Sequence, residues 1–261
     1  MASLNANIRL HVEGPLGVGE RIPLTAAQSH YLFSVMRCRS GTAVHLFNGS
    51  DGEWQADVTR QGRKSAIAYC LHRTAPQRMP PDLWLLFAPI TKARTDFIVE
   101  KATELGVRKL FPIRTAFTPA ARLPVARLQA HAIEAAEQCL GTWVPPIAPL
   151  QPLLAVLDNW PDDRRLMFCD ERCRDRPDDG LDRFDAEPAG KWAILIGPAG
   201  GFSADEAERV RRLPASHPVS LGPRLLRADT AAVAAITLWQ NSLGDWRRGS
   251  KPVPASDPGI C

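Results

Sequence analysis

Apolar and polar positions follow one pattern up to about residue 75 and a different one afterwards. In the first part, short segments of apolar and polar residues predict strands joined by tight turns, such as residues 48–52. One helical segment, residues 26–38, interrupts them and follows Thr25, whose spacing from Gln28 is typical of a capping box. Residues 1–75 are therefore predicted to form a small β-rich, barrel-like module. Its predicted strands are residues 7–12, 42–49, 53–60 and 65–72.

From residue 82, continuous apolar runs alternate with segments of helical periodicity. Three prolines within residues 74–81 disfavour both helix and central strand, which places the domain boundary there. Residues 76–248 are predicted to form an α/β domain with a mostly parallel sheet and helices on both faces. We expect an exposed charged loop at 170–190 and a disordered tail at 249–261. The predicted strands are residues 83–89, 109–113, 165–169, 192–197 and 218–221, and the predicted helices are residues 95–106, 125–140, 203–213 and 228–243.

The net charge of +4 is distributed unevenly along the chain. Residues 1–129 hold 17 Lys and Arg against 9 Asp and Glu, whereas residues 130–261 hold 15 against 19. A basic excess is what a nucleic-acid-binding face needs, because phosphate contacts supply most of the sequence-independent affinity. An ordinary solvated surface has the same composition, so charge alone leaves both readings open.

The remaining composition excludes several classes of protein. The 6 cysteines lack the spacing of a zinc site and are interpreted as reduced, mostly buried thiols, so we expect no metal. No stretch approaches the roughly 20 apolar residues of a membrane span, and the N-terminus lacks the apolar core of a signal peptide. We therefore expect a cytoplasmic protein without membrane contact.

Two Gly-Pro loops each join an apolar strand to a helix. The first, IGPAGGF at residues 196–202, precedes a second capping box formed by Ser203 and Glu206, and the other is LGPRLLR at residues 221–227. Glycine lets a backbone approach a ligand closely at the carboxyl end of a strand, which favours a cofactor site over a tight turn without ligand. The G-x-x-G-G spacing matches neither a dinucleotide fingerprint nor a P-loop.

The two loops resemble the bacterial 16S ribosomal RNA uridine N3-methyltransferase family, of the SPOUT class, when they are taken with three further segments in register. The resemblance runs from about residue 8 to residue 243. The further segments are HYLFSVMRCRSGTAVHLFNG at 30–49, KATELGV at 101–107 and IEAAEQC at 133–139, and the second loop extends as LGPRLLRADTA.

This resemblance implies a PUA-like RNA-binding β-barrel followed by a SPOUT-type α/β domain with a deep C-terminal trefoil knot. It further implies S-adenosylmethionine as cofactor, 16S rRNA of the 30S subunit as substrate, and a homodimer, for which we note Trp239 beside an apolar face of the last helix. The residues expected at the cofactor are Ile196, Gly197, Gly200, Gly201, Ser220, Leu221, Gly222, Leu226 and Arg227.

Three departures from the family pattern bear on activity. Ala199 stands where the family usually has Glu in the first loop, which removes any carboxylate from the loop itself. The segment Leu140-Gly141-Thr142-Trp143 lacks two arginines of the family, and Asp229 replaces a Glu. These departures leave open a non-catalytic RNA-binding or ribosome-assembly factor with the same fold. A SPOUT methyltransferase with another target, such as transfer RNA, is the second alternative.

Methylation of uridine N3 requires that this imide nitrogen lose its proton, so a cation near the base carbonyls would assist it. The candidates are Arg227, in the second loop, and Lys92 and Arg94, which follow the first strand of the α/β domain. Surface ion pairing is the alternative for the arginines. The residues expected to contact RNA are Arg9, Arg37, Arg39 and Arg63 in the barrel and Arg224 beside the cofactor.

Overall fold

The computed structural model describes residues 8–62, 65–119, 122–173 and 190–246. Within these ranges the chain forms two compact units. Unit 1 contains residues up to Met79 together with Ala136–Trp143, and unit 2 contains Pro80–Ala135 and the residues from Val144 onward. The inclusion of residues 136–143 in unit 1 was not predicted from the sequence. The tail expected at 249–261 lies outside the described residues.

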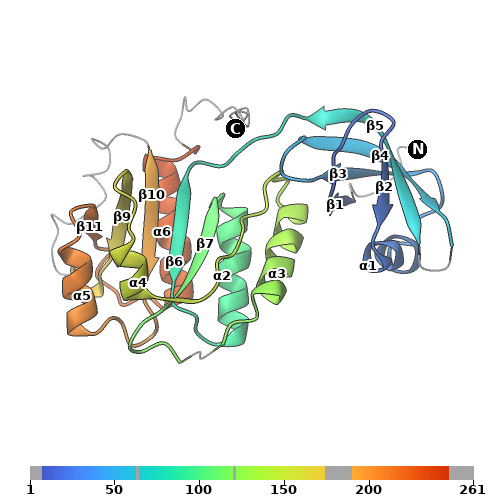
Figure 1. Cartoon of the computed structure of the whole chain (residues 1–261). Coiled ribbons are helices and arrows are strands. Elements are labelled where there is room, and N and C mark those ends of the chain that lie inside the picture. Colours follow the sequence, from blue (N-terminus) through green and yellow to red (C-terminus); the bar gives the residue numbers. More distant parts are fainter. Residues whose placement is uncertain (1–7, 63–64, 120–121, 174–189, 247–261) are drawn as a thin grey trace. The chain divides into compact units, whose positions relative to one another are not determined.

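Unit 1 is the β-rich module that the alternating pattern predicts (Figure 1). Its five strands pair in the order β1-β3-β4-β5-β2, with β1 parallel to β3 and the other pairs antiparallel. The described pairings leave β1 and β2 as the edges. The capping box at Thr25 is confirmed, but only Ala26–His30 is α-helical, because the chain continues as a π-helical turn. The elements are β1 (Arg9–His11), β2 (Arg21–Leu24), α1 (Ala26–His30), the π-helix Tyr31–Val35, β3 (Thr42–Phe47), β4 (Glu53–Arg60) and β5 (Ala66–Ala75).

Unit 2 is an α/β domain whose six strands are parallel in every described pair and are ordered β11-β9-β10-β6-β7-β8. The expected parallel sheet is thereby confirmed. Its elements are β6 (Leu83–Phe87), α2 (Lys92–Glu104), β7 (Lys109–Arg114), α3 (Val125–Gln138), β8 (Gln151–Pro152), α4 (Leu153–Asp158), β9 (Arg164–Cys169), a 3-10 turn (Glu171–Cys173), β10 (Lys191–Ile196), α5 (Ala204–Arg211), β11 (Ser216–Val219) and α6 (Ala228–Ser242).

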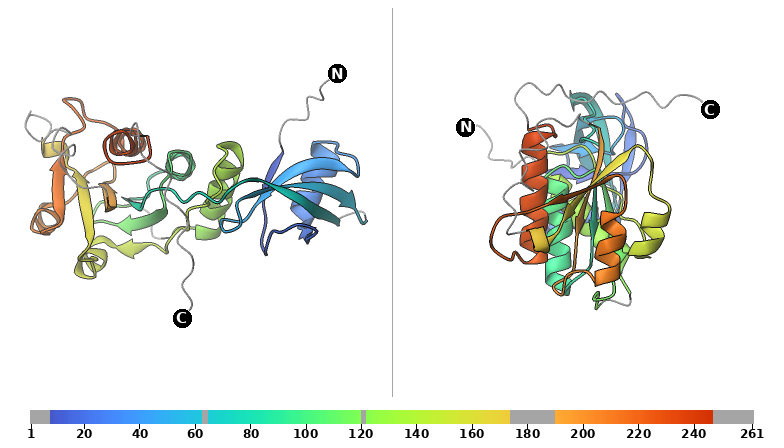
Figure 2. Two further views of the ribbon diagram at one scale, coloured as in Figure 1. Left: turned by 90° about the horizontal axis from the view of Figure 1, so that it is seen from above. Right: turned by 90° about the vertical axis from the view of Figure 1, so that its left-hand side faces the viewer.

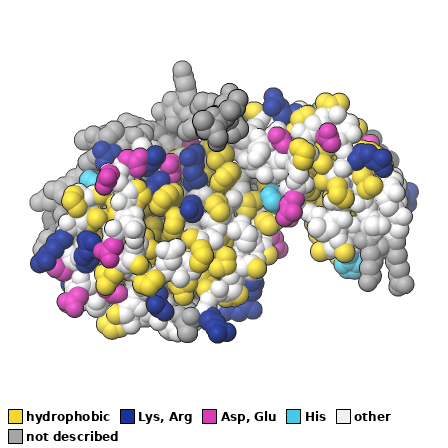
Figure 3. All heavy atoms as spheres, viewed as in Figure 1, with side chains coloured by type: hydrophobic (Ala, Val, Ile, Leu, Met, Phe, Trp, Pro, Cys, Tyr) yellow, Lys and Arg dark blue, Asp and Glu magenta, His cyan; other side chains and the backbone are white. Residues whose placement is uncertain are grey.

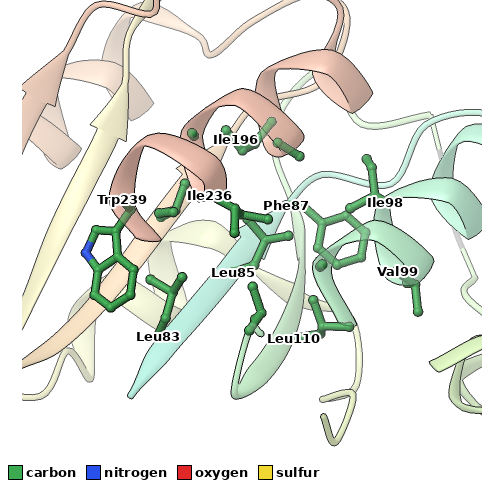
Figure 4. Packing of buried hydrophobic residues seen from close by; sticks show 14 of the residues in the cluster. Leu83, Leu85, Phe87, Ile98, Val99, Leu110, Ile196, Ile236 and Trp239 are labelled. Carbon is green, nitrogen blue, oxygen red and sulfur yellow. The ribbon is translucent and has the colours of Figure 1, made fainter. Parts of the chain in front are cut away.

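Helices cover both faces of this sheet (Figure 2). Leu83, Leu85 and Phe87 of β6 pack into the cluster that contains α2, α3 and α6 (Figure 4). Leu86 packs into the cluster with α4 and α5. Alternate residues of one strand therefore enter opposite apolar layers, because successive side chains of a strand point to opposite faces. This explains why the strands appear as continuous apolar runs rather than as alternating ones.

Trp239 belongs to this core. Its side chain on α6 is 2% exposed and packs in the same cluster as β6, so it does not present an apolar face to a second chain. Trp239 therefore offers no support for the homodimer, which stays a prediction.

Within the described ranges, no helix is long and apolar enough to cross a membrane, and no group of three or more potential metal ligands gathers. Cys38, Cys70, Cys139, Cys169 and Cys173 are free thiols.

Candidate functional site

A cavity of about 630 Å³ opens in unit 2 at the carboxyl ends of four strands. Its walls come from the segments that follow β6, β9, β10 and β11, and from the first turns of α2 and α6. In an open parallel sheet this edge is the usual place for a ligand, and the volume is that of a small-molecule site. Both Gly-Pro loops contribute to it, as their positions after β10 and β11 require.

The first loop is held firmly on both sides. The capping box of Ser203 and Glu206 fixes the start of α5, as expected from the sequence. The Glu206 carboxylate is buried, and it accepts hydrogen bonds from the backbone N–H groups of Ser203 at 3.0 Å and Ala116 at 2.8 Å. Because one carboxylate joins this loop to the turn after β7, the backbone of 197–203 is preorganised.

The second loop has fewer internal constraints. Gly222 adopts φ +100°, with open space where a side chain would begin, and its N–H donates to Ser220 Oγ at 3.2 Å. The following helix begins at Ala228, and Arg227 is its N-cap residue. Asp229 lies in the first turn of α6, where a carboxylate interacts favourably with the helix dipole.

Most residues expected at the cofactor line this cavity. Gly200 does not do so within the described lining, because it faces the side chain of Phe117, which a Cβ at this glycine would approach to 3.4 Å. The expected residues that do line the cavity are Ile196, Gly197, Gly201, Ser220, Leu221, Gly222, Leu226 and Arg227.

Three of the expected arginines also reach the cavity: Arg94, Arg224 and Arg227. Arg94 lies at the start of α2, with Nε 3.8 Å from the Asp229 carboxylate, so it is only loosely paired. Arg224 and Arg227 are exposed, and neither forms an ion pair within the part of the chain that the structure describes. Lys92 is exposed in the first turn of α2 and is absent from the described lining.

The segment after β9 is the part of the cavity that sequence reasoning missed. Asp170, Glu171 and Arg172 all line it, although the charged segment 170–190 was expected to be an exposed loop. Asp170 is instead buried, and it pairs with Arg211 of α5. Their position in the sequence could have indicated a role at the cavity, because these residues directly follow a predicted parallel strand. Residues 174–189 lie outside the described ranges.

Cys169, the last residue of β9, also lines the cavity. Burial raises the pKa of its thiol well above the ordinary value, so this side chain is a neutral, poor nucleophile.

Family comparison agrees with this architecture. Residues 77–240 match the RNA methyltransferase domain family, and residues 24–68 match the RNA methyltransferase PUA domain. The chain belongs to the RNA methyltransferase family.

Relatives of this RNA methyltransferase include ribosomal RNA small subunit methyltransferase E of Rickettsia conorii, which is 27% identical over 87% of this chain and 93% of the relative. A crystal structure of ribosomal RNA small subunit methyltransferase E from Neisseria gonorrhoeae bound to S-adenosyl methionine has a TM-score of 0.82 and 27% identity, over 93% of this chain and 100% of that one. A putative methyltransferase from Legionella pneumophila in complex with the same cofactor has a TM-score of 0.82 and 25% identity, over 92% and 99%.

Arg9 of the methyltransferase was expected to contact RNA, and the structure corrects this expectation. Its side chain is 1% exposed, and Nε donates to Glu53 at 2.6 Å. The two terminal nitrogens donate to the carbonyl oxygens of Ala136 at 2.7 Å and Gly141 at 2.8 Å, which belong to the same unit. With these donors used and buried, Arg9 is a structural residue and not a phosphate ligand.

Arg37 and Arg39 remain available at the surface of unit 1. Arg37 adopts φ +55° just after the π-helical turn, a conformation that usually favours glycine. Arg63 lies outside the described residues. On the face of unit 2 drawn in Figure 3, basic and acidic side chains are intermixed, so a continuous basic surface does not mark this face.

Proposed function

We propose that this RNA methyltransferase uses S-adenosylmethionine to methylate N3 of a uridine in 16S rRNA of the small ribosomal subunit. The observation that carries the proposal is the cavity at the carboxyl ends of β6, β9, β10 and β11, where two glycine loops meet three arginines. The names of the relatives support a small-subunit rRNA target, and the motifs in register with the uridine N3-methyltransferases support the position on the base.

S-adenosylmethionine fits the residues of this cavity. The volume of about 630 Å³ accommodates a nucleoside with an amino-acid tail, and the apolar side chains of Ile196, Leu221 and Leu226 suit an adenine. Glycines at 197, 201 and 222 leave backbone groups accessible along both loops. When bound, the cofactor supplies a methyl group on a positively charged sulfur.

The protein contributes positioning and charge. Uridine N3 must lose its proton to become a nucleophile, which leaves negative charge on the base carbonyl oxygens. Arg227 and Arg94 provide cations at the cavity that stabilise this charge. Lys92 lies outside the described lining, so we assign no catalytic role to it.

RNA binding involves both units in this proposal. Arg224 lies at the cavity, and Arg37 and Arg39 are exposed on unit 1, so all three can reach phosphate groups. We place this activity in the cytoplasm, where the small subunit is assembled.

The trefoil knot and the homodimer are also part of the proposal, both on the family resemblance. A crystal structure with the chain traced continuously through residues 190–246 tests the knot. Sedimentation at micromolar concentration tests the dimer, and the mass of a single chain would count against it.

The function is tested by titrating S-adenosylmethionine and then mapping the methylated base. We expect cofactor binding and, in a deletion strain, loss of one N3-methyluridine from 16S rRNA that the complemented strain regains. Absence of binding at millimolar cofactor would favour a non-catalytic RNA-binding factor. A methyl group lost from transfer RNA instead would identify another target.

A further inference from the structure

The cavity has one carboxylate whose oxygens are not already used. Asp170 and Glu171 both line it. Asp170 is buried, pairs with Arg211, and accepts a hydrogen bond from the Arg172 N–H at 3.1 Å. Glu171 has no hydrogen bond or ion pair to any residue in the described ranges. Its side chain is therefore left to interact with a ligand.

Glu171 lies directly against the first glycine loop. A Cβ built on Gly201 would be 2.8 Å from Glu171 Oε1, and Gly201 also adopts φ +70°. Any side chain at position 201 would have to displace this carboxylate. The positive φ accounts for the glycine, and the short distance shows that the Glu171 carboxylate lies close to the loop backbone.

The turn that carries Glu171 is well fixed. Asp170 N–H donates to the Val219 carbonyl at 3.3 Å, which connects the end of β9 to β11. The Asp170 carbonyl accepts from Cys173 N–H at 3.0 Å and closes the 3-10 turn. The buried Asp170 side chain and the buried Cys173 hold its two ends. The position of Glu171 therefore follows from the fold of the turn.

A carboxylate only accepts hydrogen bonds, so the ligand group must be a donor. The first loop offers backbone groups and the apolar Ala199 on the cavity side. S-adenosylmethionine carries three kinds of donor, the amino group of adenine, the ribose hydroxyls and the ammonium of its methionine part. We propose that Glu171 accepts a hydrogen bond from one of these donors and supplies the charged acceptor that the first loop lacks. This inference rests on the proposed use of the cofactor.

The deciding experiment is calorimetric titration of the full-length protein with S-adenosylmethionine. Glu171→Gln keeps the shape of the side chain but removes its charge, and we expect the dissociation constant to rise about tenfold, as for loss of a charge-assisted hydrogen bond. The matched control is Glu208→Gln, an exposed glutamate on α5 outside the described lining, which should stay within twofold of the unaltered protein. Equal affinity of Glu171→Gln and unaltered protein would overturn the inference.

A second titration identifies the donor. Methylthioadenosine has the adenine amino group and the ribose hydroxyls but no ammonium. If Glu171→Gln weakens both ligands equally, the partner is a donor of the adenosine part, and if it weakens only S-adenosylmethionine, the partner is the ammonium, the one donor of the methionine part.

A rescue variant separates charge from turn shape. Ala199 lines the same cavity two residues before Gly201, so Ala199→Glu in the Glu171→Gln background returns a carboxylate to this side. We expect affinity to recover to within about threefold of the unaltered protein. A double variant that binds more weakly than Glu171→Gln alone would show that negative charge is unfavourable here and would overturn the inference. If the unaltered protein itself fails to bind, the proposed function fails first.

Discussion

The arginines of the two units differ in burial, although the sequence predicted that both groups contact RNA or assist its methylation. Arg9 of unit 1 is 1% exposed, with its donors directed at Glu53 and at backbone carbonyl oxygens. Arg224 and Arg227 of unit 2 are exposed at the cavity, with no ion pair in the described ranges. A buried guanidinium must be fully paired to be tolerated, whereas an exposed one stays available to a polyanion. Burial, and not residue type, separates a structural arginine from a functional one.

Removing Arg9 should have the largest effect on stability. Arg9→Ala removes the Arg9 donors from the Glu53 carboxylate and from the carbonyl oxygens of Ala136, Glu137 and Gly141, and breaking such a buried pair costs about 3 kcal/mol. Hydrogen exchange of the β3 and β4 amides should speed up by about 100-fold. Arg39→Ala, which removes an exposed arginine of the same unit, is the control and should exchange as the unaltered protein does. Equal protection in both variants would contradict the structural role of Arg9.

Removing Arg227 should act on turnover and not on stability. Loss of one cation that stabilises developing charge typically lowers the rate about 100-fold. We therefore expect Arg227→Ala to transfer methyl groups about 100-fold more slowly at saturating cofactor, with cofactor affinity changed only a few fold. Arg209→Ala on α5, which removes a half-buried arginine paired with Asp158 outside the described lining, is the matched control. Unchanged methyl transfer would remove Arg227 from the mechanism.

Acid should weaken unit 1 through Glu53. Burial raises the pKa of this carboxyl, but hydrogen bonds from Arg9, Thr74 and His45 outweigh burial and lower the pKa below its ordinary value of 4.5. The unfolded chain then binds this proton more readily than the folded unit does, so stability is lost as the pH falls below about 4.5. Urea unfolding between pH 7 and pH 3.5 should show this slope.

The control for the acid effect is Glu53→Gln. This variant is less stable at pH 7, because Arg9 loses its charged partner, but its stability should depend less on pH in the same window. An identical slope in both proteins would assign the acid sensitivity to other groups.

Sequence reasoning predicted the long elements and missed the short ones. The strand at 53–60 and the helix beginning at 228 are strongly patterned and were found within one residue. The strand Arg21–Leu24 was missed because it is four residues long and contains a proline at a sheet edge. The helix Leu153–Asp158 was missed because fewer than two turns carry little periodicity.

The cavity residues that follow a local sequence pattern were predicted, and those that depend on contacts between distant residues were missed. A glycine loop after an apolar strand is recognisable in the sequence, so both loops were identified. Asp170 and Glu171 were not, because the partner that buries Asp170 is Arg211, which lies 41 residues further along the chain. The burial of Arg9 was missed for the same reason. It results from contacts with residues 136–141, which the periodicity of the first strand does not reveal.

The smallest expected effect on turnover concerns Arg94, whose environment is intermediate between that of the buried, paired Arg9 and that of the exposed Arg227, unpaired in the described ranges. It lines the cavity, but it is loosely paired with Asp229 across 3.8 Å, longer than a hydrogen bond. Asp229→Asn should lower turnover only about threefold, because Arg94 keeps its charge and loses only the group that directs it. Asp229→Glu has the longer reach to close this gap and should match or exceed the unaltered protein.

A double-mutant cycle shows whether Asp229 acts through Arg94. If it does, Arg94→Ala should abolish the effect of Asp229→Asn, so that the double variant turns over as Arg94→Ala alone. Methyl transfer rates at saturating cofactor, measured for all four proteins, give the coupling. Independent, multiplicative losses would mean that Asp229 serves the start of α6 through the helix dipole. Arg94 would then belong with the unpaired arginines of the cavity.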